Sequence, residues 1–590
     1  MNPQRRQHLR LAATWAVGGA GLSAGLTACQ RREPLAGAGP TPPAHWAELP
    51  GGWVGPNMAR GHAWRDGRPQ VASAPPHPAP DRRVHTLVLG AGVGGLSAAH
   101  HLMRAGIDDL AVIDLDDQPG GNAQGHRLGG LACPLGAHYL PMPGPQATDV
   151  QAWLAEIGLI RWAEGRWQAD ERHACHDPQE RLFVPDAPRG QPPASGLWRQ
   201  GRWHDGLWPG AGDQRPAPAV LRQWRQLADA IAALQRQGQF AMPTHAVPWT
   251  PALQALDAIT FADWLDAQQL TDPGLRWLMD YVCRDDYGAS AQRVSAWAGL
   301  HYFASRHGLR LPEAWGGAPH DDSEPILTWA EGNGWLTQKL AAPLGERWHP
   351  GEVAVAVRDG REVVSVDTVS ARTGQAQRWQ ARHVVLALPL TLAHRLLDAR
   401  PAPLQTVQPW LDTAPWLVSN LLLRAPLDAR PGEALSWDNV FFDTQGVAGL
   451  PPSLGYVNAR HQSLSPPVGP SLLTHYWALG GGDGHQGQAW RRALHGQPWQ
   501  DWAWRVCQDL ARVHPDLPDK LLQADLKRHG HAMVVPRPGL RSQPALPAMM
   551  RPQGVSGRLH FAHADLSAYS VFEEAFTHGA RVARQIRQGA

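Results

Sequence analysis

An α/β fold with a Rossmann-type nucleotide-binding domain is predicted by three consecutive features near residue 90. A mostly apolar run of strand length, 84–89, leads straight into Gly90-Ala91-Gly92-Val93-Gly94-Gly95. Apolar residues then recur at helical spacing from 96 to 105. A second strand, 110–113, ends at Asp114, about twenty residues beyond the glycines. Strand, glycine turn, helix and acid in this order predict a βαβ unit. A chance run of glycines is a poor explanation of the whole pattern.

The residue types in this unit have separate physical roles. Gly90 permits the tight turn, Gly92 lets the backbone approach a pyrophosphate, and Gly95 lets the helix pack closely on the strand. The pyrophosphate then meets the positive end of the helix. Asp114 is placed to hold the hydroxyl pair of a ribose. We therefore expect a dinucleotide cofactor here.

The first thirty residues predict an export signal. Arg5-Arg6 precedes an uncharged apolar run, 11–28, which is typical of a short secretory signal. The arginine pair resembles a twin-arginine signal, and Leu26-Thr27-Ala28-Cys29 resembles a lipobox. The alternative is a plain membrane anchor helix, although the run is short of the ~20 residues a span needs. We expect a protein of the periplasm and cell envelope, held on the membrane by a lipidated Cys29.

Composition describes an ordinary globular body behind this leader. The chain has 590 residues, 43% hydrophobic and 18% charged, which indicates more than one domain and no disorder. No basic stripe suggests a nucleic-acid partner. Residues 29–83 are rich in Pro and Gly, which predicts a tether. Trp46, Trp53 and Trp64 are unusual in a free linker, so part of this segment is expected to pack.

The five cysteines indicate neither a metal site nor a redox dithiol. They stand at 29, 133, 175, 283 and 507, and no CxxC pair occurs. One or two disulfides are compatible with an exported protein, and the sequence does not assign them. We predict no metal.

Two further motifs follow Asp114 and carry a family resemblance. Pro119-Gly120-Gly121-Asn122 comes first, and Gly136-Ala137-His138-Tyr139 comes after it. This order resembles the flavin-containing amine oxidase superfamily, which includes carotenoid desaturases. The resemblance implies FAD, with Gly120 and Gly121 in the cofactor loop and Gly136, Ala137 and His138 against the flavin ring. Many members carry Arg after the glycine pair, so Asn122 departs from the pattern at a phosphate contact.

Later segments extend the resemblance to the end of the chain. Val353 stands where the family's adenine-contacting Val lies, and 382–389 resembles the strand that leads back to the cofactor. Ala564-Asp565 resembles the closing flavin motif, which implies an acid on the ribityl or pyrophosphate part. A helix expected from about 571 to 587 would place Phe572 and Glu573 at the flavin N1–O2 edge, where helix N–H groups stabilise negative charge. Glu574 and His578 replace the Gly and Ser that are frequent in the family.

The resemblance divides the body into two interleaved domains. We expect an FAD-binding domain of the two-domain amine-oxidase type, interleaved with an α+β substrate domain. The expected FAD-binding segments are 84–150, 331–400 and 526–590, and the expected substrate segments are 151–330 and 401–525.

Candidate catalytic residues are less specific than the cofactor residues. Asp285 or Asp286 could receive a cationic amine, with Asp286 our choice, but helix capping or pairing with Arg284 explains both acids as well. His138 and His563 flank the expected flavin and could accept a proton. His301 and His475 come from the substrate segments and are weaker candidates.

One lysine is missing where the resemblance would place it. Many amine oxidases hold a water near flavin N5 with a Lys on the strand that here reads 416–423, and this strand has none. Lys occurs only at 339, 520 and 527, and Lys527 could approach the site. No Cys follows Cys507, so a cysteinyl flavin link is not expected.

Three functions are therefore open. The first is oxidation of an amine, with polyamines included, by hydride transfer to flavin N5, the electrons passing to oxygen, a quinone or a carrier protein. The second is desaturation or isomerisation of a lipid or isoprenoid. The third is a non-catalytic FAD-binding lipoprotein.

Overall fold

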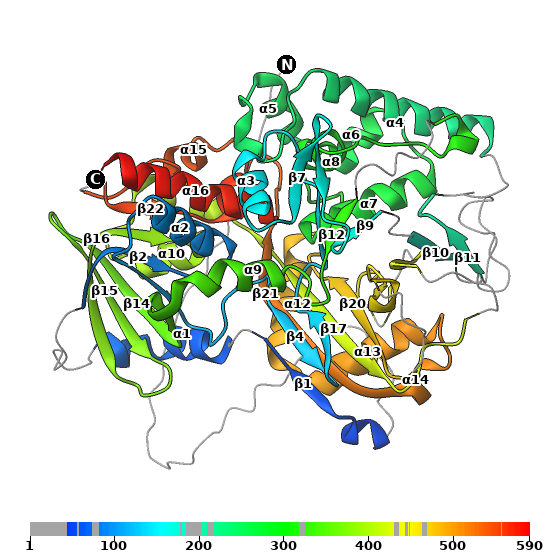
Figure 1. Cartoon of the computed structure of the whole chain (residues 1–590). Coiled ribbons are helices and arrows are strands. Elements are labelled where there is room, and N and C mark those ends of the chain that lie inside the picture. The colour runs from blue at the N-terminus through cyan, green and yellow to red at the C-terminus, as the bar shows by residue number, and fades with distance from the viewer. Residues whose placement is uncertain are drawn as a thin grey trace, which may run out of the picture. The chain divides into compact units, whose positions relative to one another are not determined.

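Two large sheets organise the part of the chain that the computed structural model describes (Figure 1). The described residues are 44–55, 58–72, 82–176, 180–184, 202–208, 216–317, 325–429, 436–442, 446–447, 449–462, 469–555 and 557–589. The predicted leader, 1–28, and Cys29 lie outside them. Within these residues no helix has both the length and the apolar character needed to cross a membrane.

The first sheet has seven strands and contains the predicted βαβ unit. Its order is β13-β3-β2-β16-β15-β14, with β22 also paired to β16. Neighbours from β13 to β22 run parallel, whereas β14, β15 and β16 form an antiparallel meander. Its strands are β2 (Arg82–Leu89), β3 (Leu110–Asp114), β13 (Trp348–Pro350), β14 (Glu352–Asp359), β15 (Val364–Ser370), β16 (Ala376–Leu386) and β22 (Leu559–Phe561).

Two helices cover one face of this sheet and pack on each other. They are α2 (Val93–Arg104) and α16 (Phe572–Gln588), blue and red in Figure 1. A Cβ on Gly579 would lie 2.3 Å from the carbonyl oxygen of Gly94, and Ser97 donates a 2.6 Å hydrogen bond to the carbonyl of Phe576. Small residues thus bring both helix N-termini to the same edge of the sheet.

The second sheet has eight strands and lies in the other half of the molecule (Figure 1). Its order is β1-β21-β17-β20-β19-β18-β10-β11. The long antiparallel pair β17·β21 lies second and third in this order, and β17 is buried along its whole length. Its strands are β1 (Gly51–Trp53), β10 (Glu180–Val184), β11 (Arg202–Asp205), β17 (Thr413–Leu423), β18 (Asp438–Phe441), β19 (Tyr456–Asn458), β20 (Ser471–Ala478) and β21 (Leu521–Val534).

Three small sheets and a helical layer complete the described structure. The small sheets join β6 (Tyr139–Pro141), β12 (Ile326–Thr328) and β9 (Ala174–Cys175); β4 (Gly125–Leu128) and β5 (Leu131–Pro134); and β7 (Ile160–Ala163) and β8 (Arg166–Ala169). The other helices are α1 (Met58–Ala72), α3 (Thr148–Glu156), α4 (Pro218–Arg236), α5 (Pro251–Asp257), α6 (Phe261–Ala267), α7 (Pro273–Tyr287), α8 (Ala296–Ala304), α9 (Gly334–Ala341), α10 (Leu390–Leu396), α11 (Ala402–Val407), α12 (Gly484–Gly496), α13 (Trp499–Ala511), α14 (Leu517–Lys520) and α15 (Ala545–Met549). The 3₁₀ turns are η1 (Ala44–Glu48), η2 (Thr244–Ala246), η3 (Glu313–Trp315), η4 (Ala342–Arg347), η5 (Gln408–Trp410), η6 (Ala459–Gln462) and η7 (Ala564–Ser567).

The predicted fold class is confirmed. The structure is α/β, with a Rossmann-type domain and a mixed second domain, and β2, α2, β3, β16 and α16 lie where the sequence placed them. The division into domains stays a prediction, and β21 runs continuously through the predicted boundary at 526. In the predicted tether, β1 pairs with β21 and Trp46 is buried. None of the four described cysteines forms a disulfide.

Candidate active site

The glycine turn between β2 and α2 is built by backbone contacts that exclude side chains. Gly90 has a φ of +101°, a conformation that favours glycine. A Cβ on Gly95 would lie 1.9 Å from the carbonyl oxygen of Gly90, so only glycine lets the helix approach the strand this closely. Both positions therefore have the roles that the sequence predicts for them.

Gly92 differs from its neighbours because nothing fills the space beside it. A Cβ there would meet no atom within 4 Å, and no side chain caps α2, whose N-cap is Gly92. The start of α16 at Val571 likewise has no side-chain cap. Two uncapped N-termini at one sheet edge leave N–H groups available for anionic groups of a bound dinucleotide.

The acid at the end of β3 belongs to the same turn. Asp114 accepts hydrogen bonds from the backbone N–H of Ala91 at 2.7 Å and of Asp116 at 2.8 Å. Burial raises the pKa of Asp114 to about 6, although both N–H groups oppose that rise. Val353 lies on β14, just after β13, whose Pro350 pairs with Asp114 at the end of β3; its contact with adenine stays a prediction.

The second glycine pair closes over the first. Gly120 has a φ of +123°, and its N–H donates to the carbonyl of Ala91 at 2.8 Å. A Cβ on Gly121 would lie 3.2 Å from the Cα of Gly92. Asn122 follows but turns away, because its amide donates to the carbonyl of Ala532 at 2.8 Å. Gly121 instead accepts a 3.3 Å hydrogen bond from the Lys527 ammonium of β21.

The segment 136–139 connects the cofactor turn to the second sheet. A Cβ on Gly136 would lie 2.3 Å from the carbonyl oxygen of Asn122, which fixes this segment beside the glycine pair. Tyr476 of β20 donates to the carbonyl of Gly136 at 2.8 Å and lies 2.5 Å from Nδ1 of His138. Ala137 accepts the N–H of Asn333 at 3.0 Å.

His138 is held neutral in this arrangement. Burial lowers its pKa to about 3, and its Nε2 is buried without a hydrogen-bond partner among the described residues. Because the Tyr476 hydroxyl donates to Gly136, the Nδ1 of His138 carries the proton and donates to Tyr476. A group that binds a proton this weakly is a poor general base at neutral pH, so the geometry favours a positioning role for His138.

The closing motif lies at the end of β22. Asp565 is buried and accepts the N–H of Leu390 at 2.9 Å, and His563 lies 3.2 Å from its carboxylate. Burial opposes ionisation of Asp565, but His563 and the Leu390 N–H together keep its pKa below the usual value. Phe572 and Glu573 form the first turn of α16, as predicted. Both predicted roles, the Asp565 contact to the cofactor and proton transfer by His563, stay predictions.

The two neighbouring acids of α7 have different surroundings. Asp286 pairs with Arg306 at 3.1 Å and accepts a hydrogen bond from the Tyr569 hydroxyl, so our preferred acid already has partners within the protein. Asp285 has neither an ion pair nor a hydrogen bond to its side chain among the described residues. The structure thus distinguishes two positions that the sequence left as alternatives.

Asp285 lies in a group of three acids that the sequence did not identify as a group. Glu180 and Asp438 are direct neighbours across the parallel strands β10 and β18. Burial first, and then Asp286 and Glu180, raise the pKa of Asp285 to about 7. Burial, and then Glu180 and Asp285, raise the pKa of Asp438 well above its usual range. Burial also raises the pKa of Glu180 to about 7. Glu180 is nevertheless exposed at the start of β10, so burial disfavours its charge less than that of the half-buried Asp285 and Asp438.

Aromatic side chains join this acid group, defined as Glu180, Asp285 and Asp438, to the segment 136–139. The Trp437 ring lies 5.6 Å from His138 and 6.3 Å from Tyr139, edge to face. Burial and then the nearby Asp285 raise the pKa of Tyr139 well above its usual range. The acid group therefore adjoins the residues that the resemblance places against a flavin.

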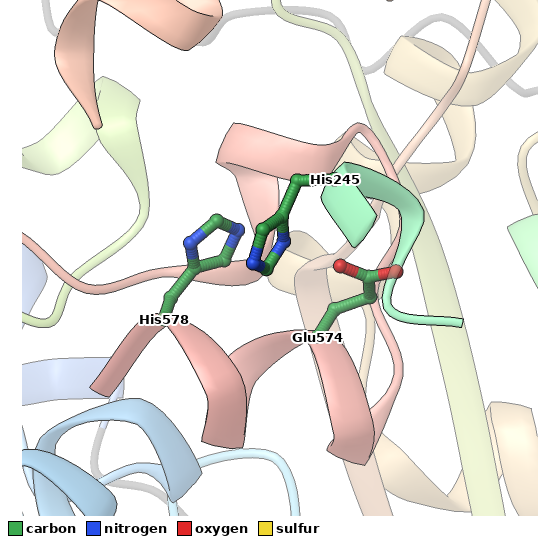
Figure 2. A group of neighbouring side chains, drawn as sticks. All are labelled: His245, Glu574 and His578. Carbon is green, nitrogen blue, oxygen red and sulfur yellow. The ribbon is translucent and has the colours of Figure 1, made fainter. Parts of the chain in front are cut away.

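A second cluster of titratable groups lies between α16 and the turn η2 (Figure 2). The ligand atoms of His245, Glu574 and His578 lie within 4.8 Å of one another. Thr244 N–H donates to Glu574 at 2.5 Å, and Ser567 bridges Glu574 and His578 at 2.5 and 2.8 Å. Burial, and then nearby arginines, lower the pKa of His245 to about 4. Hydrogen bonds within the protein already occupy the Glu574 carboxylate and the His578 ring, and nearby arginines disfavour a further cation. That the protein binds no metal stays a prediction.

We expect Glu574→Gln to change how stability depends on pH. Burial raises the pKa of Glu574 to about 7, above its unfolded value. Between pH 5 and 7 the folded protein keeps a proton that the unfolded chain releases, so the wild type loses stability as the pH rises. The variant lacks this titration. From pH 5 to pH 8 the free energy of unfolding of the variant, measured relative to wild type by thermal unfolding, should therefore increase by about 1 kcal/mol or more. A difference in stability that stays constant over this range would contradict the prediction.

Comparison with known proteins decides the family. A model of the flavin containing amine oxidoreductase family matches residues 93–587. The chain belongs to this family. It is therefore an FAD-dependent oxidoreductase, as the resemblance implied, and the uncapped helix termini and the open space at Gly92 fit the diphosphate and the flavin of FAD.

Similar proteins have several activities. An L-amino acid dehydrogenase of Synechocystis is 24% identical over 380 residues, which is 63% of this chain and 67% of that protein. A putative flavin-containing monoamine oxidase of Mycobacterium tuberculosis is 26% identical over 320 residues, 54% of this chain and 59% of that protein. A redesigned putrescine oxidase matches with a TM-score of 0.61 at 17% identity, covering 87% of this chain and 100% of that chain. A fatty acid isomerase from P. acnes matches with a TM-score of 0.54 at 15% identity, covering 85% and 98%.

Proposed function

We propose that the enzyme oxidises an amine that carries a second positive charge, such as a diamine or polyamine. The acid group supports this proposal more than any other observation. Glu180, Asp285 and Asp438 have no ion-pair partner among the described residues, although the pKa of each shows that its charge is strongly disfavoured. A cation bound among them would relieve that cost.

The fold itself makes these three acids unfavourable in the absence of a ligand. Glu180 and Asp438 face each other across a strand pair, where like charges destabilise a sheet. Asp285 lies in the last turn of α7, where the helix dipole disfavours a negative charge. Unpaired charges kept at a structural cost next to a cofactor are typical of a binding site.

The catalytic requirements on the side chains are modest. When bound, FAD supplies a hydride acceptor at N5. The acid group would hold the distal ammonium, and the rings of Trp437 and Tyr139 would flank the chain of methylenes that leads to the reacting amine. The hydrogen bonds of Tyr476 with His138 and with the Gly136 carbonyl would fix the segment that the resemblance places against the flavin.

Anaerobic reduction of the bound flavin tests the proposal. We expect putrescine and spermidine to bleach the flavin at substrate concentrations at least tenfold below those needed for a monoamine of equal length. An L-amino acid or an unsaturated fatty acid should leave it oxidised. Reduction by an L-amino acid alone would instead support a dehydrogenase of the kind that Synechocystis has, and would overturn the proposal.

The lipid or isoprenoid alternative has one observation in its favour. The fatty acid isomerase from P. acnes shares the fold. Three acids beside Tyr139 would, however, repel the carboxylate of a fatty acid and leave their charge cost unrelieved beside an apolar chain. Isomerisation of a fatty acid with no net change in the flavin absorbance would favour this alternative.

We further propose export by the twin-arginine route and anchoring through Cys29, with electrons passed to oxygen, a quinone or a carrier protein. The support is the arginine pair, the apolar run and Cys29 in the sequence. Cell fractionation tests it. Cys29→Ala should move the protein from the membrane to the soluble periplasmic fraction, and replacing Arg5 and Arg6 with lysines should keep it in the cytoplasm. Unchanged fractions would contradict the proposal.

A further inference from the structure

Lys527 is an unusual charged residue for the interior of this protein. Its side chain is only 1% exposed, and it is one of three lysines in the chain. Among the described residues, its ammonium makes one hydrogen bond, the 3.3 Å bond to the Gly121 carbonyl. No carboxylate of the described residues lies within 4 Å of it, in contrast to Lys520, which pairs with Asp428 and Asp516. A buried ammonium with one carbonyl acceptor is costly to keep.

The position of Lys527 is specified by the backbone around it. Gly121, its acceptor, lies against Gly92 at the uncapped start of α2. On the other side, β1 pairs with β21, and a Cβ on Gly55 would lie 2.9 Å from the Lys527 side chain. The N-terminal segment therefore packs against this side chain, whose ammonium reaches the glycine loop at Gly121.

The same loop lacks a cation where one would be expected. Position 122 holds an uncharged, exposed Asn whose amide is bonded to the carbonyl of Ala532. The FAD diphosphate carries two negative charges, and the N–H groups of α2 supply only part of the compensating charge. A cation from elsewhere in the chain would add to this compensation.

We propose that Lys527 supplies the positive charge that holds the FAD diphosphate, in place of a cationic residue at position 122. The ammonium would donate to a phosphate oxygen while keeping its bond to Gly121. Burial lowers its pKa to about 7, so the diphosphate would also draw a proton onto the free amine as it binds. This role differs from holding a water for the reaction with oxygen, although Lys527 lies directly across from Val418 of β17.

Reconstitution of the apoprotein with two flavins tests the proposal without measuring turnover. Lys527→Met should weaken FAD by about 10- to 100-fold and leave riboflavin, which has no diphosphate, within about twofold of wild type. Lys520→Met, the matched control on a lysine with carboxylate partners, should change neither affinity. Calorimetry in buffers of different ionisation enthalpy should show proton uptake on FAD binding at pH 8 in wild type and none in Lys527→Met.

A charge-relocation variant keeps the proposal falsifiable if Lys527→Met perturbs folding. Adding Asn122→Arg to Lys527→Met should restore at least tenfold of the lost FAD affinity, because the cation returns to the same loop from the other side. Equal weakening of FAD and riboflavin, or unchanged FAD affinity with only a slower reaction with oxygen, would overturn the proposal. Failure of the double variant to recover FAD affinity would also count against it.

Discussion

Gly95→Ala is expected to destabilise the apoprotein by about 3 kcal/mol or more. The added Cβ would lie 1.9 Å from the carbonyl oxygen of Gly90, and backbone cannot yield as a flexible side chain can. To relieve the contact, α2 must move away from β2, which would also disturb its packing on α16. Thermal unfolding of the apoprotein should show a clearly lower melting temperature, with FAD binding lost as a consequence.

Gly92→Ala is the matched control, which should leave the stability of the apoprotein unchanged and weaken FAD binding directly. No protein atom lies within 4 Å of the added Cβ, and the φ of −71° suits any residue. The apoprotein should therefore melt within about 1 °C of wild type, while FAD binds at least about tenfold more weakly because the methyl group occupies the space for the diphosphate. A normal FAD affinity in this variant would show that the diphosphate lies elsewhere.

These two glycines also show why the cofactor half of the protein was predictable. Their roles depend on contacts between residues close in sequence, so strand, turn and helix order fixes the geometry. The same holds for the start of α16, where Phe572 and Glu573 form the first turn as expected. Local patterns are enough wherever a site is built from consecutive residues.

The substrate side was less predictable because it depends on pairing between distant strands. Nothing in the sequence aligns Glu180 with Asp438, which are neighbours only because β10 and β18 pair in parallel. The choice of Asp286 over Asp285 likewise depended on Arg306 and Tyr569, two partners that the fold supplies. For Lys527 the sequence offered one signal. Lysine is scarce in this chain, and an uncharged Asn follows the second glycine pair.

Asp285→Asn is expected to have the largest effect on substrate choice. Removing one of the three acids that would bind the distal ammonium should lower kcat/KM for a diamine by about 10- to 100-fold, with a smaller loss for a monoamine. Asp286→Asn is the control, since it breaks the contacts with Arg306 and Tyr569 but leaves the acid group intact. That variant should melt at a lower temperature and keep the diamine-to-monoamine ratio of wild type.

The pH dependence of this preference gives an independent test. Asp285 has a pKa of about 7 because burial and then Asp286 disfavour its charge, so the carboxylate forms only as the pH rises through 7. The preference for a diamine should therefore increase from pH 6 to pH 8 in wild type and increase less in Asp285→Asn, where Glu180 alone of this pair still titrates in that range. The folded state also keeps a proton on Asp285 that the unfolded chain releases below pH 7, so ionisation costs stability at higher pH. The variant should thus be at least as stable as wild type at pH 8, and a large loss of stability there would mean that Asp285 is structural and that the amine is held by other groups.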